Sequence, residues 1–166
     1  MTSVKVRPMR EADIESIIAI DALITGAGGS DRAGFWRGLL SLHAPPPDDP
    51  PDAGEGSPLP SLHLCHVAET SGPGQIRLVG FIIGDVQSWQ FGLPRHGRVV
   101  TIGVHPEYRR RDVATHLVES LIETFRKMGL PFVHCLARPG EALGAFFESL
   151  GFRRPGFEIL ERSLRS

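Results

Sequence analysis

Three consecutive arginines stand where an apolar segment gives way to a long amphipathic stretch, and this arrangement suits the binding of a phosphate. The segment from Thr101 to Thr115 contains Arg109, Arg110 and Arg111 at that junction. The first turn of a helix has unpaired N–H groups and the positive end of the helix dipole, so it attracts anions. Neighbouring guanidinium groups add positive charge suited to a pyrophosphate or a 3′-phosphate. The residues alone therefore predict an anion site at this helix start.

Two carboxylates are candidates for proton transfer. Asp85 and Glu69 each lie on an expected strand that leads toward the predicted site. Either side chain is able to accept a proton from an amine. Carboxylates near strand ends are more often solvated or ion-paired than catalytic, so both readings stay open for each residue.

Histidines and cysteines raise the question of a metal site, and the residues concerned are His63, Cys65, His66, His134 and Cys135. Alternation along a strand places His63 and Cys65 on one face and His66 on the other, and the sequence has no C-x-x-C. This geometry favours packed or surface side chains, so no metal site is expected. Two cysteines make no disulfide framework, which indicates a reducing cytosol and a cytoplasmic protein.

The apolar periodicities predict the elements that must position these groups. Strands are expected over residues 4–7, 62–69, 76–86, 98–104, 132–137 and 157–163, and helices over 14–23, 30–40 and 141–150, with the longest running from 113 toward Gly129. Three consecutive strands with short connections predict an antiparallel meander. The strand–helix–strand unit from Arg98 to Ala137 predicts a parallel pair with a right-handed crossover. The expected fold class is α/β (α+β), with a mixed, mostly antiparallel central sheet flanked by helices.

Length and composition predict one globular domain spanning residues 1–166. Residues 44–60 are rich in proline and indicate an exposed insertion loop, although a docking segment is the alternative. The net charge of -1 gives no reason to expect nucleic acid or an anionic membrane as a partner. No apolar run approaches the roughly 20 residues of a membrane helix, and the start of the chain lacks the apolar stretch of a secretory signal.

Three blocks in order resemble the GNAT N-acetyltransferase superfamily. Residues Val104 to Ala114 (VHPEYRRRDVA) resemble the acetyl-CoA loop of that family, which reads V-x-P-x-Y followed by Q/R-x-x-G-x-G/A. Residues Ala145 to Phe152 (AFFESLGF) resemble its second block, A-x-x-F-Y-E-x-L-G-F, and Val6 to Asp13 is similar to its usual opening. The resemblance covers nearly the whole chain. It implies a parallel strand pair that splays apart to admit acetyl-CoA.

The resemblance also implies roles for the residues around this loop. Main-chain groups of three strand residues would bind the pantetheine arm, and an amide near Val104 would polarise the thioester carbonyl. Main-chain N–H groups from Arg110 to Thr115 would bind the pyrophosphate. The cofactor-binding residues expected on this basis are Ile102, Gly103, Val104, Arg109, Arg110, Arg111, Asp112, Val113, Ala114 and Thr115.

The chain departs from the family pattern at a few positions. Asp112 stands where the family carries the first loop glycine, and its carboxylate would either cap the helix or occupy the anion site itself. Phe147 stands where many relatives carry a tyrosine that protonates the CoA thiolate, and Gly140 replaces a frequent asparagine. The short tail after Gly151 leaves the acceptor site either open or completed by a second subunit of a homodimer.

The resemblance implies an acetyl-CoA-dependent N-acetyltransferase that acts on a primary amine. The acceptor is a protein N-terminus, a lysine or a small amine, and no residue decides among them. The alternative is a catalytically lapsed domain that acts as a CoA sensor or an interaction module, which the departures at Asp112 and Phe147 favour.

Overall fold

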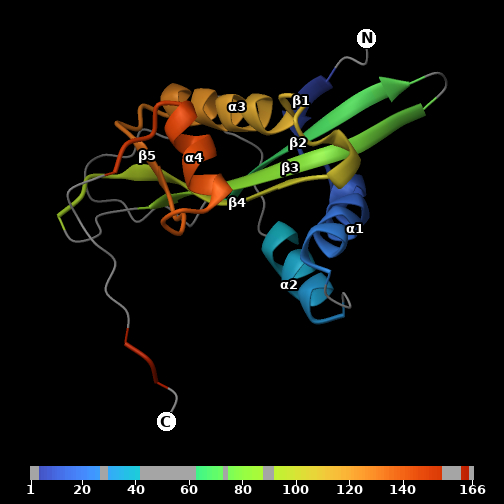
Figure 1. The fold of residues 1–166 in the computed structure, drawn as a ribbon, viewed down its shortest axis with the longest axis horizontal. Helices are drawn as coiled ribbons and strands as arrows, with labels where there is room; N and C mark the ends of the chain where they lie inside the picture. The colour runs from blue at the N-terminus through green and yellow to red at the C-terminus, as the bar shows by residue number, and fades with distance from the viewer. Residues whose placement is uncertain are drawn as a thin grey trace. The chain divides into compact units, whose positions relative to one another are not determined.

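Five strands form one mixed sheet in the computed structural model, which describes residues 4–26, 30–41, 63–72, 75–87, 92–154 and 162–164. The strands are β1 (Val4–Pro8), β2 (His63–Gly72), β3 (Gln75–Gln87), β4 (His96–Val104) and β5 (Val133–Cys135). Their order in the sheet follows the chain; β1 to β4 pair antiparallel, and β4 pairs β5 in parallel (Figure 1). The predicted mixed, mostly antiparallel sheet with one parallel pair is confirmed. Two compact units divide the chain, Met1–Leu136 with the sheet and Ala137–Ser166.

Helix α3 (Val113–Lys127) covers one face of the sheet (Figure 1). It approaches so closely that some strand positions have no room for a side chain. A Cβ added at Gly84 would lie 2.8 Å from atoms of both Leu121 and Phe125, and one added at Gly97 would lie 2.7 Å from the Phe125 ring. The two glycines therefore set how near this helix lies to β3 and β4.

Helices α1 (Ile14–Thr25) and α2 (Ser30–Ser41) lie on the opposite face (Figure 1). Trp36 of α2 is 1% exposed, and its ring packs edge-on against Phe81 of β3 with centroids 5.2 Å apart. The indole N–H donates to Asp21 Oδ2 of α1 at 2.7 Å. Asp21 is therefore buried on this face of α1, whereas Leu23 is 57% exposed.

The unit Ala137–Ser166 contains helix α4 (Ala142–Ser149). Phe147 is its buried residue, and the Phe147 ring packs edge-on against Phe146 and Phe152 with centroids 5.3 and 4.9 Å apart. The chain enters this helix through a turn in which Gly140 has a φ of 81°.

Some predictions about the elements need correction or lie outside the described residues. The strand expected over residues 132–137 is shorter, since β5 pairs with only three residues of β4. The proline-rich segment 44–60 and most of the last expected strand, 157–163, lie outside the described residues. In the described ranges, no helix is long and apolar enough to cross a membrane.

Candidate functional site

The edge between β4 and β5 opens part-way along β4. The parallel pairing involves β4 only from Gly97 to Val99, and no later pairing between the two strands occurs in the described residues. β4 continues to Val104 and remains paired with β3 on its other side. Its outer edge beyond Val99 therefore presents main-chain N–H and C=O groups without strand partners. Three predicted site residues lie on this open edge, Ile102, Gly103 and Val104.

A β-bulge marks the point where the strands part. Ile83 lies opposite Thr101 and Gly84 lies opposite Val99, so Val100 has no partner on β3. An extra residue in one strand bends that strand and increases its local twist. Because pairing with β5 also ends at Val99, the bulge gives a physical reason for the separation.

His105 fixes the main chain where it leaves β4. Its N–H donates to the Val79 carbonyl of β3 at 2.9 Å, and its side chain is buried. Its Nδ1 accepts from the Glu107 N–H at 3.3 Å, which caps the short 3-10 helix η2 (Pro106–Tyr108). The Tyr108 ring packs edge-on against the imidazole with centroids 5.6 Å apart. The loop therefore starts from a fixed corner, a role of His105 that sequence reasoning did not identify.

The loop backbone adopts conformations that are unfavourable for most L-residues. Arg110 and Asp112 have φ values of 59° and 58°, in the left-handed region that favours glycine. The first main-chain bond of α3 runs from the His116 N–H to the Asp112 carbonyl at 3.0 Å. Within the described residues, the N–H groups of residues 110–115 donate no main-chain hydrogen bond. Amides turned together by alternating conformations form an anion-binding concavity.

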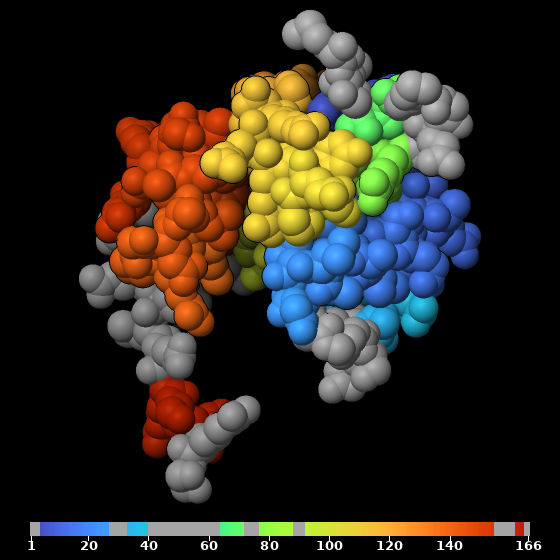
Figure 2. Space-filling view, turned by 45° about the vertical axis from the view of Figure 1, so that its right-hand side comes forward, coloured from blue at the N-terminus to red at the C-terminus, as the bar shows by residue number. Residues whose placement is uncertain are grey.

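The three arginines of the loop are exposed. The loop belongs to the yellow segment of the surface in Figure 2. Arg109 Nε donates to the Val104 carbonyl at 3.4 Å, and the Arg111 guanidinium lies 5.4 Å from the centroid of the Tyr108 ring. Arg77 of β3 approaches the same ring at 5.9 Å, a contribution that the sequence did not indicate. Among the ion pairs of the described residues, none involves Arg109, Arg110 or Arg111. Their positive charge is therefore available to an anion.

Asp112 does not use its carboxylate on the helix. It is the N-cap residue of α3, yet its side chain is exposed and makes no cap hydrogen bond. Both behaviours expected from the sequence, capping the helix or filling the anion site, require the carboxylate to accept from the first amides of α3. Neither occurs in this structure, because the left-handed backbone at Asp112 is not the extended conformation from which an N-cap side chain reaches those amides.

Asp85 is the buried partner of an ion pair with a half-exposed arginine. It is 2% exposed and accepts from Arg98 of β4, with Nε 3.0 Å from Oδ1 and a terminal nitrogen 2.5 Å from Oδ2. Gln87 Nε2 donates to Oδ1 at 2.8 Å. These bonds occupy the carboxylate oxygens that a general base would need, so the geometry supports the paired reading.

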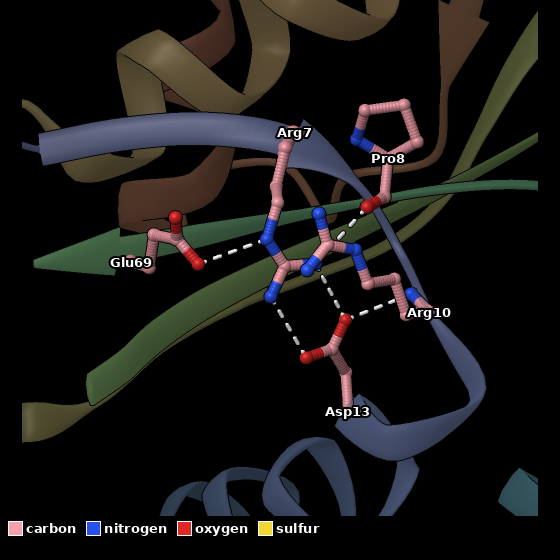
Figure 3. A network of polar contacts seen from close by, with 5 residues as sticks. All are labelled: Arg7, Pro8, Arg10, Asp13 and Glu69. Carbon is pink, nitrogen blue, oxygen red and sulfur yellow. Dashed lines mark hydrogen bonds and ion pairs between the residues drawn. The ribbon is translucent and has the colours of Figure 1, made fainter. Parts of the chain in front are cut away.

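Glu69 is part of an ion-pair network that joins β1, β2 and the 3-10 helix η1 (Glu11–Asp13) (Figure 3). Arg7 Nε donates to Glu69 Oε2 at 2.8 Å, and its terminal nitrogens donate to the two Asp13 oxygens at 2.7 and 2.9 Å. Burial alone raises the pKa of Asp13, but hydrogen bonds from Arg7 and from the Arg10 N–H outweigh it and leave that pKa below its usual value. The position of Glu69 supports a structural role.

Five histidines and cysteines were considered for metal binding: His63, Cys65, His66, His134 and Cys135. Within the described ranges, no group of three or more His, Cys, Asp or Glu side chains is arranged to hold a metal ion. Cys65 and Cys135 are free thiols. Burial raises the pKa of Cys65 to about 12 and also raises that of Cys135, so both remain protonated and weakly nucleophilic at neutral pH.

Comparison with known protein families identifies the family of this chain. The family model described as "Acetyltransferase (GNAT) family" matches residues 37–152. The chain belongs to the GNAT acetyltransferase family. The match includes β4, the loop of exposed amides and α4, which carry two of the three blocks of the resemblance; the opening block, Val6 to Asp13, lies outside it. Sequence comparison with curated proteins finds no match.

Solved structures with similar folds include several GNAT enzymes. The aminoglycoside N-acetyltransferase AAC(6')-Iy in complex with CoA has a TM-score of 0.70 and 16% identity, with 99% of this chain and 97% of that chain covered. AAC(6')-Ih from Acinetobacter baumannii has a TM-score of 0.68 and 15% identity, with 99% and 100% covered. A ribosomal-protein-alanine N-acetyltransferase from Brucella melitensis biovar Abortus 2308 has a TM-score of 0.66 and 15% identity, with 98% and 100% covered. At these identities the similarity is one of fold.

Proposed function

We propose that this GNAT protein transfers the acetyl group of acetyl-CoA to a primary amine. The observation that carries the proposal is two stretches of unpaired main chain, the open edge of β4 and the loop over residues 110–115, which the hydrogen-bonded turn at η2 connects. The strand edge suits the amide-bearing pantetheine arm, since that arm can pair with it as a neighbouring strand does. The loop suits the diphosphate.

The residues present fit acetyl-CoA in both hydrogen bonding and charge. The loop amides have no main-chain partner in the described residues, and the carboxylate of Asp112 is not bonded to them. Arg109, Arg110 and Arg111 add exposed positive charge beside those amides. Crystals of a similarly folded aminoglycoside N-acetyltransferase with CoA support this class of ligand.

In the proposed reaction, bound acetyl-CoA supplies a thioester, and the chain binds and orients it. A main-chain amide on the open edge of β4 donates to the thioester oxygen, where negative charge develops as the amine attacks. Holding the amine in line with the carbonyl carbon contributes much of the rate. Phe147 has no hydroxyl to donate, so the departing thiolate takes its proton from water.

The acceptor is a primary amine whose identity remains open among a protein N-terminus, a lysine and a small amine. The similarly folded enzymes are named for different amines, an aminoglycoside in one case and a protein alanine in another. We therefore propose the reaction class rather than one acceptor, and we place the enzyme in the cytosol as either a monomer or a homodimer.

A lapsed enzyme that binds CoA as a sensor or interaction module is the second candidate. The observation in its favour is Phe147, which is 3% exposed, packs between Phe146 and Phe152 and lacks the hydroxyl of an acid. Such a protein would bind acetyl-CoA and release no thiol in the presence of amines.

A thermal-shift titration tests the proposal. A ligand at 100 times its Kd stabilises the folded state by about 2.7 kcal/mol, which raises the melting temperature of a domain of this size by roughly 5–10 °C. S-acetylpantetheine is the matched control ligand, since it has the thioester and the arm but no diphosphate, and it should produce a much smaller shift. No shift with acetyl-CoA refutes the proposal. A clear shift with no thiol release from any amine tested supports the lapsed enzyme.

A further inference from the structure

A row of three ionisable side chains crosses the sheet just before β4 and β5 part. Asp85 of β3 lies opposite Arg98 of β4, and Arg98 lies opposite His134 of β5. The next pair, Val99 with Cys135, is the last one before the strands separate. This Asp85–Arg98–His134 row therefore lies at the closed end of the splay, next to the open edge of β4 that the proposed function assigns to the pantetheine arm and its thioester.

A column of aromatic rings supports His134. Its ring lies 4.6 Å from the ring of His96, which in turn stacks on Phe132 at 4.7 Å with an interplanar angle of 15°. His96 is 0% exposed, and its Nδ1 lies 2.7 Å from the carbonyl oxygen of Pro94. Since a carbonyl only accepts, Nδ1 of His96 carries the hydrogen, which fixes the orientation of that ring. The column holds the His134 imidazole in place.

The His134 side chain is only partly buried. Its Nδ1 is enclosed and has no hydrogen-bond partner among the described residues. Burial lowers the pKa of His134, and the neighbouring His96 and Arg98 lower it further, while Asp85 acts in the opposite direction. The imidazole is therefore neutral at physiological pH, with a lone pair available for a proton.

The other members of the row lack this capacity. The guanidinium of Arg98 is permanently protonated, and the oxygens of Asp85 are occupied by Arg98 and Gln87. Neither group can take a proton from an incoming ammonium as readily as a neutral imidazole. The ion pair instead places a fixed positive charge beside His134.

We propose that His134 is the catalytic residue that accepts the proton of the acceptor amine, an inference that rests on the proposed function. The ammonium of the acceptor loses one proton to the imidazole and becomes a free amine. The amine nitrogen forms a bond to the thioester carbonyl carbon, and the C–S bond breaks with its electron pair on sulfur. The second amine proton passes through water to the thiolate, and the imidazolium returns the first proton to solvent. The products are an amide, a thiol and one released proton.

The test compares His134→Gln with His116→Gln, the same change at an exposed histidine of α3. Thiol release from acetyl-CoA is measured from pH 5.5 to 9 with four acceptors: a peptide with an N-terminal alanine, a peptide that contains a lysine, glucosamine and an aminoglycoside. For His134→Gln we expect kcat/KM to fall by roughly 10²- to 10⁴-fold. In the wild type, kcat/KM should decline at low pH as the base becomes protonated, and this decline should be absent in His134→Gln. Added imidazole should restore part of the rate in His134→Ala, which a purely structural role would not allow.

Thermal shifts separate this inference from the proposed function. Acetyl-CoA should stabilise His134→Gln and the wild type equally, because His134 lies outside the predicted acetyl-CoA-binding residues. If neither protein shifts, the proposed function fails. If both shift and His134→Gln keeps the rate and pH profile of His116→Gln, the assignment of His134 is overturned. A wild type that binds acetyl-CoA and acetylates none of the four acceptors overturns it as well.

Discussion

Replacing Asp112 measures how much a misplaced charge weakens the anion site. The carboxylate is exposed at the N-cap of α3 and makes no cap hydrogen bond, so its removal breaks no bond of the helix. Two unit charges 4 Å apart in water interact by about 1 kcal/mol, and the value rises as solvent is excluded. Against a diphosphate, loss of this repulsion is worth roughly 1–2 kcal/mol. Asp112→Asn should therefore bind acetyl-CoA about 5- to 30-fold more tightly than the wild type.

Asp112→Gly is the companion variant, because it removes the charge and relaxes the backbone together. The left-handed φ of 58° costs glycine little, but glycine loses more entropy on folding, and the two effects of about 1 kcal/mol nearly cancel. Its melting temperature should stay within about 2 °C of the wild type. Calorimetric titration with acetyl-CoA at low and high salt provides the affinities, and the gain should shrink at high salt. An Asn variant with wild-type affinity at low salt would refute the electrostatic reasoning.

Further predictions concern the loop and the two ion-pair clusters. Arg110→Gly should keep its melting temperature within about 2 °C of the wild type, because relief of the left-handed φ of 59° and the added chain entropy of glycine nearly cancel. It should nevertheless weaken acetyl-CoA binding through loss of charge, and an unchanged affinity in calorimetric titration would contradict this. Arg98→Gln should lower the free energy of unfolding in urea by about 3–5 kcal/mol, because it leaves the buried Asp85 carboxylate without its charge partner. Asp85→Asn should lower it by only about 1–2 kcal/mol, since the Arg98 side chain is 36% exposed and can reach water. Equal losses in the two variants would contradict this asymmetry. The pKa of Asp13 is lower in the folded protein than its unfolded value of about 4, so the ionised carboxylate stabilises the fold above pH 4, and this stability is lost as pH falls through the folded pKa. Asp13→Asn should therefore lose less stability than the wild type between pH 5 and pH 2.5. Parallel losses in the two proteins would contradict this prediction.

The sequence predicted the described elements well because their signals are local. The apolar stripe of α3 repeats within one helix, and the arginines directly precede it in the chain. The β4–β5 crossover also follows from element order alone, since a helix between two adjacent strands makes them parallel. Such features depend on neighbours a few residues apart, so one chain without further information is sufficient to predict them.

Features that depend on strand register could not be predicted in the same way. The pairing of Asp85 with Arg98 requires the β3–β4 register, and the sequence shows no sign of the bulge at Val100 that shifts it. Nothing local reveals that Arg98 also lies beside His134, because that contact depends on where a parallel strand returns. The inward turn of Asp21 likewise depends on a bond to Trp36 from the next helix.

The loop conformation in this protein is imposed by its surroundings rather than by glycine. Each non-glycine residue in the left-handed region costs about 1–2 kcal/mol, so Arg110 and Asp112 would not adopt it in an isolated segment. On one side the main chain is held by the bond from His105 to Val79, and on the other by Val113, which is 1% exposed at the start of α3. Because both ends of this short segment are fixed, few backbone conformations can connect them. The amide geometry therefore survives the replacement of glycine by aspartate, and what the replacement changes is the charge that an incoming diphosphate meets.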